Sequence, residues 1–394
     1  MLNDLPSYAP DPIIALMQTF MADARTDKID LGVGVYKDPD GKTPIFRAVK
    51  AAETRILETQ TTKGYLPLSG DPVFHAAART LVFGADAAVD RIATIATPGG
   101  SSALRQLLDL VALVRPGAKV WISDPTWPNH AGLAGAARLT PVNYRYYVES
   151  AGTVDWDGMM GDLAGIGPDD IVILHAAAHN PTGADLTPEQ WSVLGDLFER
   201  TGAMPLVDVA YQGFADGVEE DAAGLRHLAS RLPNMLVALS GSKSFGLYRD
   251  RAAAAFVLSE TAALRDVVQG NLTGLNRLNF AFPPDHGTRV MTEILNDAGL
   301  RADWEAELAS MRTRLKANRM MLAKALRETL QTDRFDVLER QRGMFSILGF
   351  DDALLERLRA DHALYLVKQG RINLAGLTEA NTPLVARAIA SELR

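Results

Sequence analysis

From about residue 45, short apolar segments alternate with helical patterns, and this alternation constrains the fold more than any other feature of the chain. The apolar segments lie at residues 93–96, 119–123, 171–175, 204–208, 235–240 and 253–258. Helical patterns separate them, for example at residues 102–114 and 188–201, the second with Thr187 as N-cap and Pro188 at its first position. Strands that alternate with helices form a mostly parallel sheet covered on both faces. We therefore expect a doubly wound α/β domain.

The two ends of the chain follow other patterns. Residues 13–24 read as a helix and 28–44 as strand and loop, while a charged amphipathic helix is expected over residues 303–329. Further segments are expected at residues 335–350, 353–361 and 364–394. We predict three parts: an N-terminal arm with part of a small domain at 1–43, a large domain at 44–305, and a small C-terminal domain at 306–394. A ligand is expected between the two domains.

Composition excludes several classes of protein. The 394 residues hold 40 Lys and Arg against 48 Asp and Glu, and the net charge of −8 argues against nucleic-acid or anionic-membrane partners. There is no cysteine, which excludes disulfides, thiolate metal sites and Cys nucleophiles. The first 20 residues lack a signal-peptide pattern, and no stretch reaches the ~20 apolar residues of a membrane helix. We expect a cytoplasmic protein.

Two loops after predicted strands carry groups suited to an anion or to covalent chemistry. Residues 97–105 place two glycines and two serines at a helix start, which is typical of either a capped turn or a phosphate site. Lys243 follows the 235–240 strand, at the sheet edge where such folds bind ligands. It is either an amine that forms a Schiff base or a solvated loop lysine. Ser240 and Lys243 also match the Ser/Lys dyad of penicillin-recognising acyl hydrolases, but no Ser-Asp-Asn or Lys-Thr-Gly element accompanies them.

Other polar residues stand at the ends of apolar segments. Asp208 ends a strand, where a carboxylate needs a cationic partner or caps the next turn. His175 and His179 have the i,i+4 spacing of a helical metal site, but no Glu follows His175 and turn residues follow His179, so we predict no metal. Arg371 offers a planar fork that suits a carboxylate, or lies on the surface.

Taken in order, these segments resemble one family across essentially the whole chain: the class I pyridoxal-phosphate aminotransferases of fold type I, nearest to the aspartate and aromatic-amino-acid enzymes of the α subgroup. The matching residues are 34–38, Tyr65, 97–100, 124–130, 179–183, 208–214, 240–243, Arg251, 343–346 and 370–373.

The resemblance implies a large domain with a mostly parallel sheet, a smaller α/β domain, and pyridoxal 5'-phosphate bound covalently to Lys243. It implies that Asp208 keeps the pyridine nitrogen protonated, that Tyr211 and Asn180 donate to the phenolic oxygen, and that Trp127 stacks on the ring. The implied phosphate cup consists of Gly100, Ser101, Ser102, Ser240 and Arg251, with Tyr65 from a second subunit. His130 and His175 are implied to support Asp208 rather than bind metal.

The resemblance also implies the substrate contacts and a homodimer. Arg371 would bind the α-carboxylate, helped by Asn180, Gly34 and Trp127, and Arg277 of the neighbouring subunit would bind a distal carboxylate. Three departures from the family pattern are Ser101 for Thr, Ser102 for Gly, and a less polar run after Arg277.

The apolar residues Leu66 and Phe282, together with Arg277, predict dual specificity. We expect transamination of tyrosine and phenylalanine with 2-oxoglutarate in a ping-pong reaction, with tryptophan as a further candidate and with aspartate and glutamate also accepted. The alternative is an aspartate aminotransferase with little aromatic activity. A β-lyase or decarboxylase, and a non-catalytic cofactor-binding module, are the remaining readings.

Overall fold

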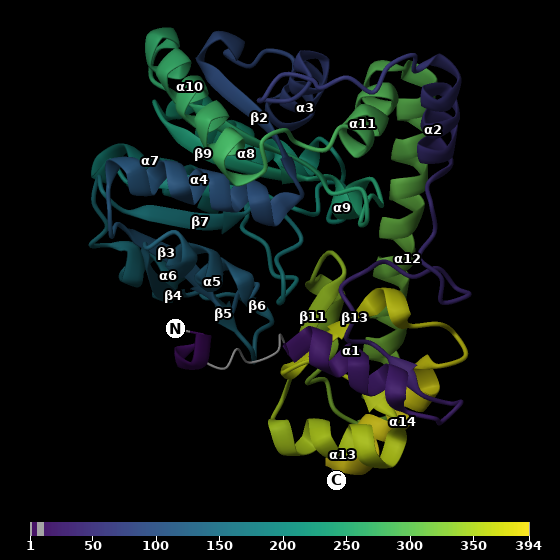
Figure 1. Ribbon diagram of the computed structural model, residues 1–394. Coiled ribbons are helices and arrows are strands. Elements are labelled where there is room, and N and C mark those ends of the chain that lie inside the picture. The colour runs from purple at the N-terminus through teal and green to yellow at the C-terminus, as the bar shows by residue number, and fades with distance from the viewer. Residues whose placement is uncertain (1, 6–11, 394) are drawn as a thin grey trace.

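A computed structural model of the protein describes residues 2–5 and 12–393, and its central feature is a seven-stranded sheet (Figure 1). The strand order is β2-β10-β9-β8-β7-β3-β4. β10 runs antiparallel to both of its neighbours, and the other strands are parallel, so the prediction of a mostly parallel sheet is confirmed. The strands are β2 (Ile92–Pro98), β3 (Lys119–Asp124), β4 (Thr140–Arg145), β7 (Ile171–His175), β8 (Met204–Val209), β9 (Met235–Ser240) and β10 (Ala252–Leu258).

Six of these strands coincide with the apolar segments of the sequence. β7 and β9 have the predicted bounds, and the other four extend by one to three residues. β4 is not predicted from the sequence, because its residues Thr-Pro-Val-Asn-Tyr-Arg contain no apolar run. β4 lies at the edge of the sheet with four of its six residues exposed, so its sequence needs no such run.

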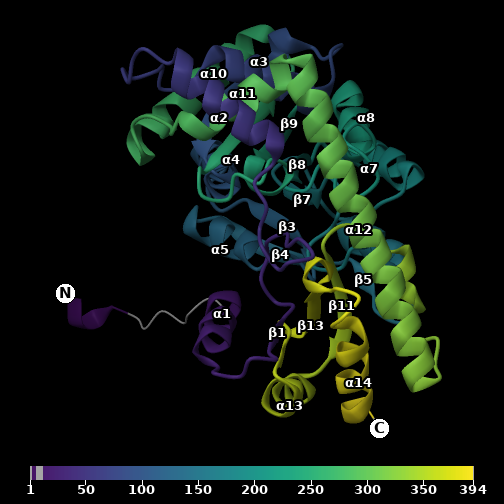
Figure 2. The same ribbon diagram turned by 90° about the vertical axis from the view of Figure 1, so that its right-hand side faces the viewer.

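Alternate residues of the central strands pack on opposite faces of the sheet. In β10, Ala254 and Phe256 belong to one apolar core, whereas Ala255 and Val257 belong to the other. Helices cover both faces, as Figures 1 and 2 show. The second core includes residues of α4 (Gly100–Val114), α5 (Asn129–Ala136) and α10 (Ala262–Asn279). The first includes residues of α2 (Arg47–Thr59), α3 (Pro72–Phe83), α7 (Pro188–Thr201), α8 (Ala223–Arg231), α11 (His286–Asn296) and α12 (Ala298–Leu330).

Helix α7 begins and ends as the sequence predicts. Thr187 accepts a hydrogen bond from the backbone N–H of Gln190, and the Gln190 side chain accepts one from the N–H of Thr187, which makes a capping box. Pro188 is the first helical residue, and Gly202 ends the helix in the left-handed conformation at φ 71°.

The N-terminal segment pairs with the C-terminal part of the chain. β1 (Ile29–Asp30) runs parallel to β12 (Leu364–Tyr365), and the side chain of Asn373 donates to the carbonyls of Val33 and Val35 at 2.6 and 2.8 Å. Figures 1 and 2 both place α1 (Pro12–Ala22) beside these C-terminal elements. The remaining elements are β5 (Tyr147–Val148), β6 (Thr153–Val154), α6 (Trp156–Leu163), α9 (Gly241–Ser244), β11 (Phe345–Phe350), α13 (Asp352–His362), β13 (Gln369–Asn373) and α14 (Thr382–Leu393).

The long helix α12 links the sheet to the C-terminal elements. It is continuous from Ala298 to Leu330, five residues longer at its start than predicted, and the expected boundary between residues 305 and 306 falls inside it. The division into domains stays a prediction. None of the described helices has the length and apolarity to cross a membrane.

Candidate active site

The site lies where three neighbouring strands of the sheet end. His175 of β7 pairs with Asp208 of β8, and Ser240 is the last residue of β9, so the carboxyl ends of these strands bring the three side chains to one edge. A cavity of about 220 Å³ opens there. Its lining residues are Gly34, Gly100, Ser101, Leu104, Trp127, His175, Asn180, Asp208, Ala210, Tyr211, Ser240, Ser242, Lys243, Tyr248 and Arg251.

Lys243 supplies an amine to this cavity from a half-buried position. It lies on the short helix α9, whose N-cap Ser240 accepts a hydrogen bond from the N–H of Ser242. Its Nζ is 5.0 Å from the centre of the Tyr211 ring. Burial lowers the pKa of Lys243, Asp208 opposes that change, and two arginines add to it. A lowered pKa gives a larger share of the neutral amine that attacks a carbonyl.

Asp208 is a buried carboxylate that stays ionised. Burial alone would raise its pKa, but the hydrogen bond from His130 and the nearby positive groups outweigh burial and hold the pKa below its usual value. Nε2 of His130 lies 3.2 Å from Oδ2 of Asp208, and Nδ1 of His130 lies 2.9 Å from Oγ1 of Thr126. Thr126 also lies 3.2 Å from Nε2 of His175. Asp208 can therefore face a cationic group in the cavity.

The other two histidines near Asp208 are held by neighbouring hydroxyl groups. Burial lowers the pKa of His175 and of His179 well below the usual value, so both rings are neutral. His179 is held by Ser123 at 3.0 Å and by Thr182 at 2.9 Å. The described residues contain no group of three possible ligands that could hold a metal ion.

The N-terminus of α4 faces the cavity with groups that suit an anion. Its N-cap Gly99 offers no side-chain cap and has φ 86°. A Cβ at Gly99 would lie 2.0 Å from a terminal nitrogen of Arg251, so only glycine lets that guanidinium approach the helix end. Ser101 and Ser240 add hydroxyls. Helix N–H groups, hydroxyls and a guanidinium together match the chemistry of a phosphate.

Asn180, Tyr211 and Arg371 lie close together, and the first two line the cavity. Arg371 is 5% exposed, donates to the carbonyl of Gly32 at 2.6 Å, and its Nη1 lies 3.5 Å from Oδ1 of Asn180. Burial raises the pKa of Tyr211, so its hydroxyl keeps its proton and can act as a donor. Arg371 itself is not among the residues that line the cavity.

Comparison with known families gives a direct match to this arrangement. The family model for aminotransferase class I and II matches residues 26–389. The chain belongs to this aminotransferase family.

The relatives of this aminotransferase include enzymes named for two kinds of substrate. It is 48% identical over 389 residues to the aromatic-amino-acid aminotransferase of Paracoccus denitrificans, covering 99% of each chain. It is 40% identical over 396 residues to the aspartate aminotransferase of Escherichia coli strain K12, covering 100% of each. A solved aromatic-amino-acid aminotransferase from Burkholderia pseudomallei, covalently bound to pyridoxal phosphate, matches with a TM-score of 0.97 at 38% identity over 100% of each chain. The predicted fold class is confirmed.

Five of the predicted site residues of the aminotransferase do not line the cavity of their own chain: His130 and Arg371, whose contacts are given above, and Tyr65, Arg277 and Ser102. Tyr65 is 86% exposed, and its ring stacks on Phe282 with centroids 4.4 Å apart. Arg277 is exposed, with its guanidinium carbon 6.0 Å from the centre of the Phe282 ring. Ser102 does not line the cavity, and its N–H donates to the carbonyl of Gly99 at 3.0 Å.

Four residues that line the cavity of the aminotransferase were not predicted as site residues. They are Leu104, Ala210, Ser242 and Tyr248. Tyr248 lies in the turn that follows α9, five residues after Lys243, and its hydroxyl accepts a hydrogen bond from the backbone N–H of Tyr36 at 3.0 Å. Its position between Lys243 and Arg251 is the one signal in the sequence that points to it.

Proposed function

We propose that this aminotransferase transfers amino groups from tyrosine, phenylalanine and tryptophan to 2-oxoglutarate, and that it also accepts aspartate and glutamate, in a ping-pong reaction with pyridoxal 5'-phosphate. The observation that carries the proposal is that Lys243, Asp208 and the N-terminus of α4 meet on one cavity. The names of the relatives support both kinds of substrate. A cytoplasmic location stays a prediction.

The cavity fits pyridoxal phosphate at each end of that molecule. The uncapped start of α4 with Ser101, Ser240 and Arg251 suits the phosphate. The ionised Asp208 suits a protonated ring nitrogen, and Lys243 supplies the amine for a covalent bond to the aldehyde. Trp127 offers an aromatic face among the lining residues.

Different residues of the chain have different roles in the proposed reaction. Pyridoxal phosphate, when bound, withdraws electrons from the substrate's Cα and so makes its C–H bond acidic. Asp208 holds the proton on the ring nitrogen, and His130 keeps Asp208 ionised and oriented. Nζ of Lys243 moves the proton from Cα, and burial, which lowers its pKa, raises the share of the neutral amine that can accept that proton. Tyr211 and Asn180 hold the phenolic oxygen, and Arg371 orients the α-carboxylate.

We propose a homodimer in which Tyr65 and Arg277 act in the site of the partner. Both residues lie outside the cavity of their own chain, and both contact the ring of Phe282. Leu57 and Leu278 are also exposed, at 82% and 83%, and burial of such residues favours association. In this arrangement Tyr65 and Arg277, both packed against Phe282, extend together into the neighbouring site.

Arg277→Ala tests the shared use of one pocket by acidic and aromatic substrates. We expect kcat/KM for aspartate to fall by about 100-fold or more, because truncating one partner of a buried charge pair costs roughly 2–5 kcal/mol. We expect kcat/KM for phenylalanine to fall by less than about 10-fold, because a ring makes no ion pair with Arg277. Arg387→Ala, an exposed arginine on α14, is the matched control and should change neither value.

The two outcomes separate the proposal from its alternative. Equal losses for both substrates would show that Arg277 has no selective role and would contradict dual use of the pocket. A wild-type enzyme with high activity toward aspartate and little toward phenylalanine would identify an aspartate aminotransferase instead. Both values come from steady-state kinetics with 2-oxoglutarate as the common acceptor.

A further inference from the structure

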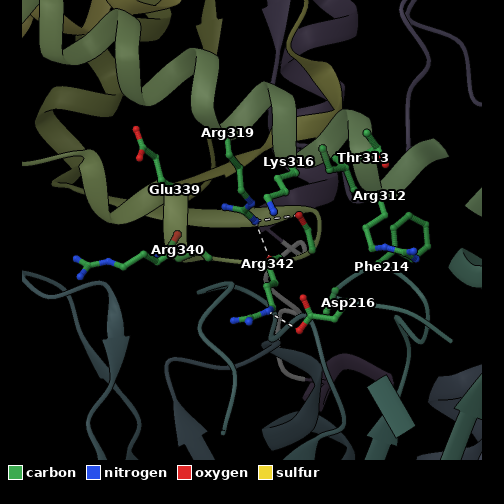
Figure 3. A pocket seen from close by; sticks show the side chains of 13 residues that line it. Phe214, Asp216, Arg312, Thr313, Lys316, Arg319, Glu339, Arg340 and Arg342 are labelled. Carbon is green, nitrogen blue, oxygen red and sulfur yellow. Dashed lines mark hydrogen bonds and ion pairs between the residues drawn. The ribbon is translucent and has the colours of Figure 1, made fainter. Parts of the chain in front are cut away.

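Arg319 is a buried cation that the proposed mechanism does not use. It lies on α12, is 1% exposed, and lines one wall of a second cavity, of about 730 Å³ (Figure 3). No carboxylate of the described residues lies within ion-pair distance of its guanidinium. Burying a cation without a paired acid is costly, so its place in the core calls for a specific reason.

The guanidinium of Arg319 donates only to uncharged oxygens of one short segment. Nη1 donates to Oγ of Ser346, and Nη2 donates to the carbonyls of Arg342, Gly343 and Phe345 at 2.7, 2.8 and 2.7 Å. A planar guanidinium with five N–H donors can satisfy several acceptors at once, which an ammonium or an apolar side chain cannot. Arg319 therefore fixes the path of residues 342–346, of which the family resemblance includes 343–346 without a role.

The same segment packs against the turn that carries Asn180. The N–H of Arg342 donates to the carbonyl of Gly183 at 2.8 Å. A Cβ at Gly183, which has φ 68°, would lie 2.6 Å from the carbonyl oxygen of Phe345 and 3.2 Å from Nη2 of Arg319. Only glycine fits at this position. The turn that carries Asn180 is therefore packed closely against residues 342–346 and Arg319 of α12.

The segment held by Arg319 places Phe345 against the substrate side of the active site. Phe345 is 1% exposed, and the guanidinium carbon of Arg371 lies 4.6 Å from the centre of its ring. The Tyr211 ring meets it edge-on at 6.0 Å, and a Cβ at Gly34 would lie 3.9 Å from its Cζ. One aromatic ring thus lies beside three residues predicted to surround the substrate carboxylate and the cofactor oxygen.

We propose that Arg319 is a positioning residue for the α-carboxylate site: it holds the backbone of residues 342–346 so that Phe345 orients Arg371. Arg319 touches neither substrate nor cofactor in this role. The proposal rests on the proposed function of Arg371 and adds a determinant of substrate affinity outside the cavity. It applies equally to aromatic and acidic substrates, because both carry the α-carboxylate.

The test compares Arg319→Met and Arg319→Lys with the wild-type holoenzyme. Methionine keeps the volume of the buried stem without its donors, and lysine keeps the charge without the fork. We expect Arg319→Met to raise KM for phenylalanine and for aspartate alike by about 10- to 100-fold, the range expected when a supporting group misplaces a site by about 1 Å. We expect kcat to change by less than about 3-fold, and Arg319→Lys to give intermediate KM values.

A binding measurement checks the same claim without turnover. 3-Phenylpropionate carries a carboxylate and no amine, so it can bind but cannot react. Its dissociation constant, measured by competition and by the visible spectrum of the holoenzyme, should rise with KM in both variants. Lys316→Ala is the matched control: Lys316 is exposed, lies one turn away on α12 and lines the same cavity, and its loss should change no value.

Each outcome decides the proposal. Unchanged KM and dissociation constants in a folded Arg319→Met, or a loss of kcat with KM unchanged, would overturn it. If circular dichroism shows that Arg319→Met does not fold, Arg319→Lys decides, and a KM within 2-fold of the wild type would overturn it. A wild-type enzyme that transaminates neither substrate would defeat the proposed function instead, which keeps the two failures distinct.

Discussion

At the scale of single residues, the chemistry depends on charges held in place by burial. Asp208 is ionised because His130 and nearby cations outweigh the effect of burial on its pKa, and Lys243 loses part of its proton affinity by burial. Removing the negative charge of Asp208 should remove the support for a protonated ring nitrogen.

Asp208→Asn tests that claim by replacing a carboxylate with a neutral amide of the same shape. We expect kcat to fall by about 10²- to 10³-fold, the usual loss when one preorganised electrostatic contact is removed. His130→Asn should cause a smaller loss, since the carboxylate remains. Retention of more than a tenth of the wild-type kcat in Asp208→Asn would contradict the role of Asp208, with cofactor content checked by absorbance.

The sequence predicted most of the residues that the structure gathers, and the reason is physical. Asp208, Ser240 and Lys243 stand at or just beyond the ends of buried strands, where a parallel sheet must place them at one edge. Tyr65 and Arg277 could not be located this way, because their proposed sites lie on a second chain. Tyr248 and Arg319 were missed because their roles come from contacts between distant segments.

At the scale of elements, the turn between β7 and α7 is organised by a buried carboxyl group. Oδ2 and Oδ1 of Asp185 accept hydrogen bonds from the N–H groups of Ala178 and His179, each at 2.8 Å. Burial raises the pKa of Asp185 from 3.8 to about 6. Neither such turns nor the exposed edge strand β4 have regularly spaced apolar residues. The central strands could therefore be predicted from the sequence better than the connections between them.

This shift predicts a pH dependence of stability with a definite sign. A carboxyl whose pKa is higher in the folded state binds its proton more tightly there, so stability falls as pH rises from about 4 to 6. The fall from this one group is about 3 kcal/mol, at 1.36 kcal/mol for each pKa unit. Asp185→Asn should lack that part of the slope. Urea unfolding of the holoenzyme at several pH values measures how stability depends on pH. The control variant Asp86→Asn, at an exposed residue, should keep the wild-type slope. An unchanged slope in Asp185→Asn would refute the assignment.

At the scale of the whole molecule, the proposed dimer predicts that two variant chains restore activity when they form a hybrid dimer. Lys243→Ala and Arg277→Ala each damage aspartate turnover. If Arg277 serves the partner's site, a hybrid dimer of the two variants contains one site with both native residues and one with neither. Mixing the two inactive proteins under subunit exchange should therefore restore aspartate activity to roughly a quarter of the wild-type value, half of the dimers being hybrid with one intact site each. No recovery, with exchange verified by differently tagged chains, would place Arg277 in its own chain's site.

The central claim is that one cavity around Lys243 handles aromatic and acidic amino acids with the same cofactor. The most direct measurement is the visible absorption spectrum of the purified holoenzyme, with phenylalanine or aspartate added separately and no 2-oxo acid present. The account predicts that each amino acid alone converts the absorption of the bound pyridoxal form to that of the pyridoxamine form, and that Lys243→Ala shows neither conversion at a comparable rate. Conversion by aspartate alone would contradict dual specificity, and a protein that gains no absorption band on addition of pyridoxal phosphate would contradict the assignment of Lys243.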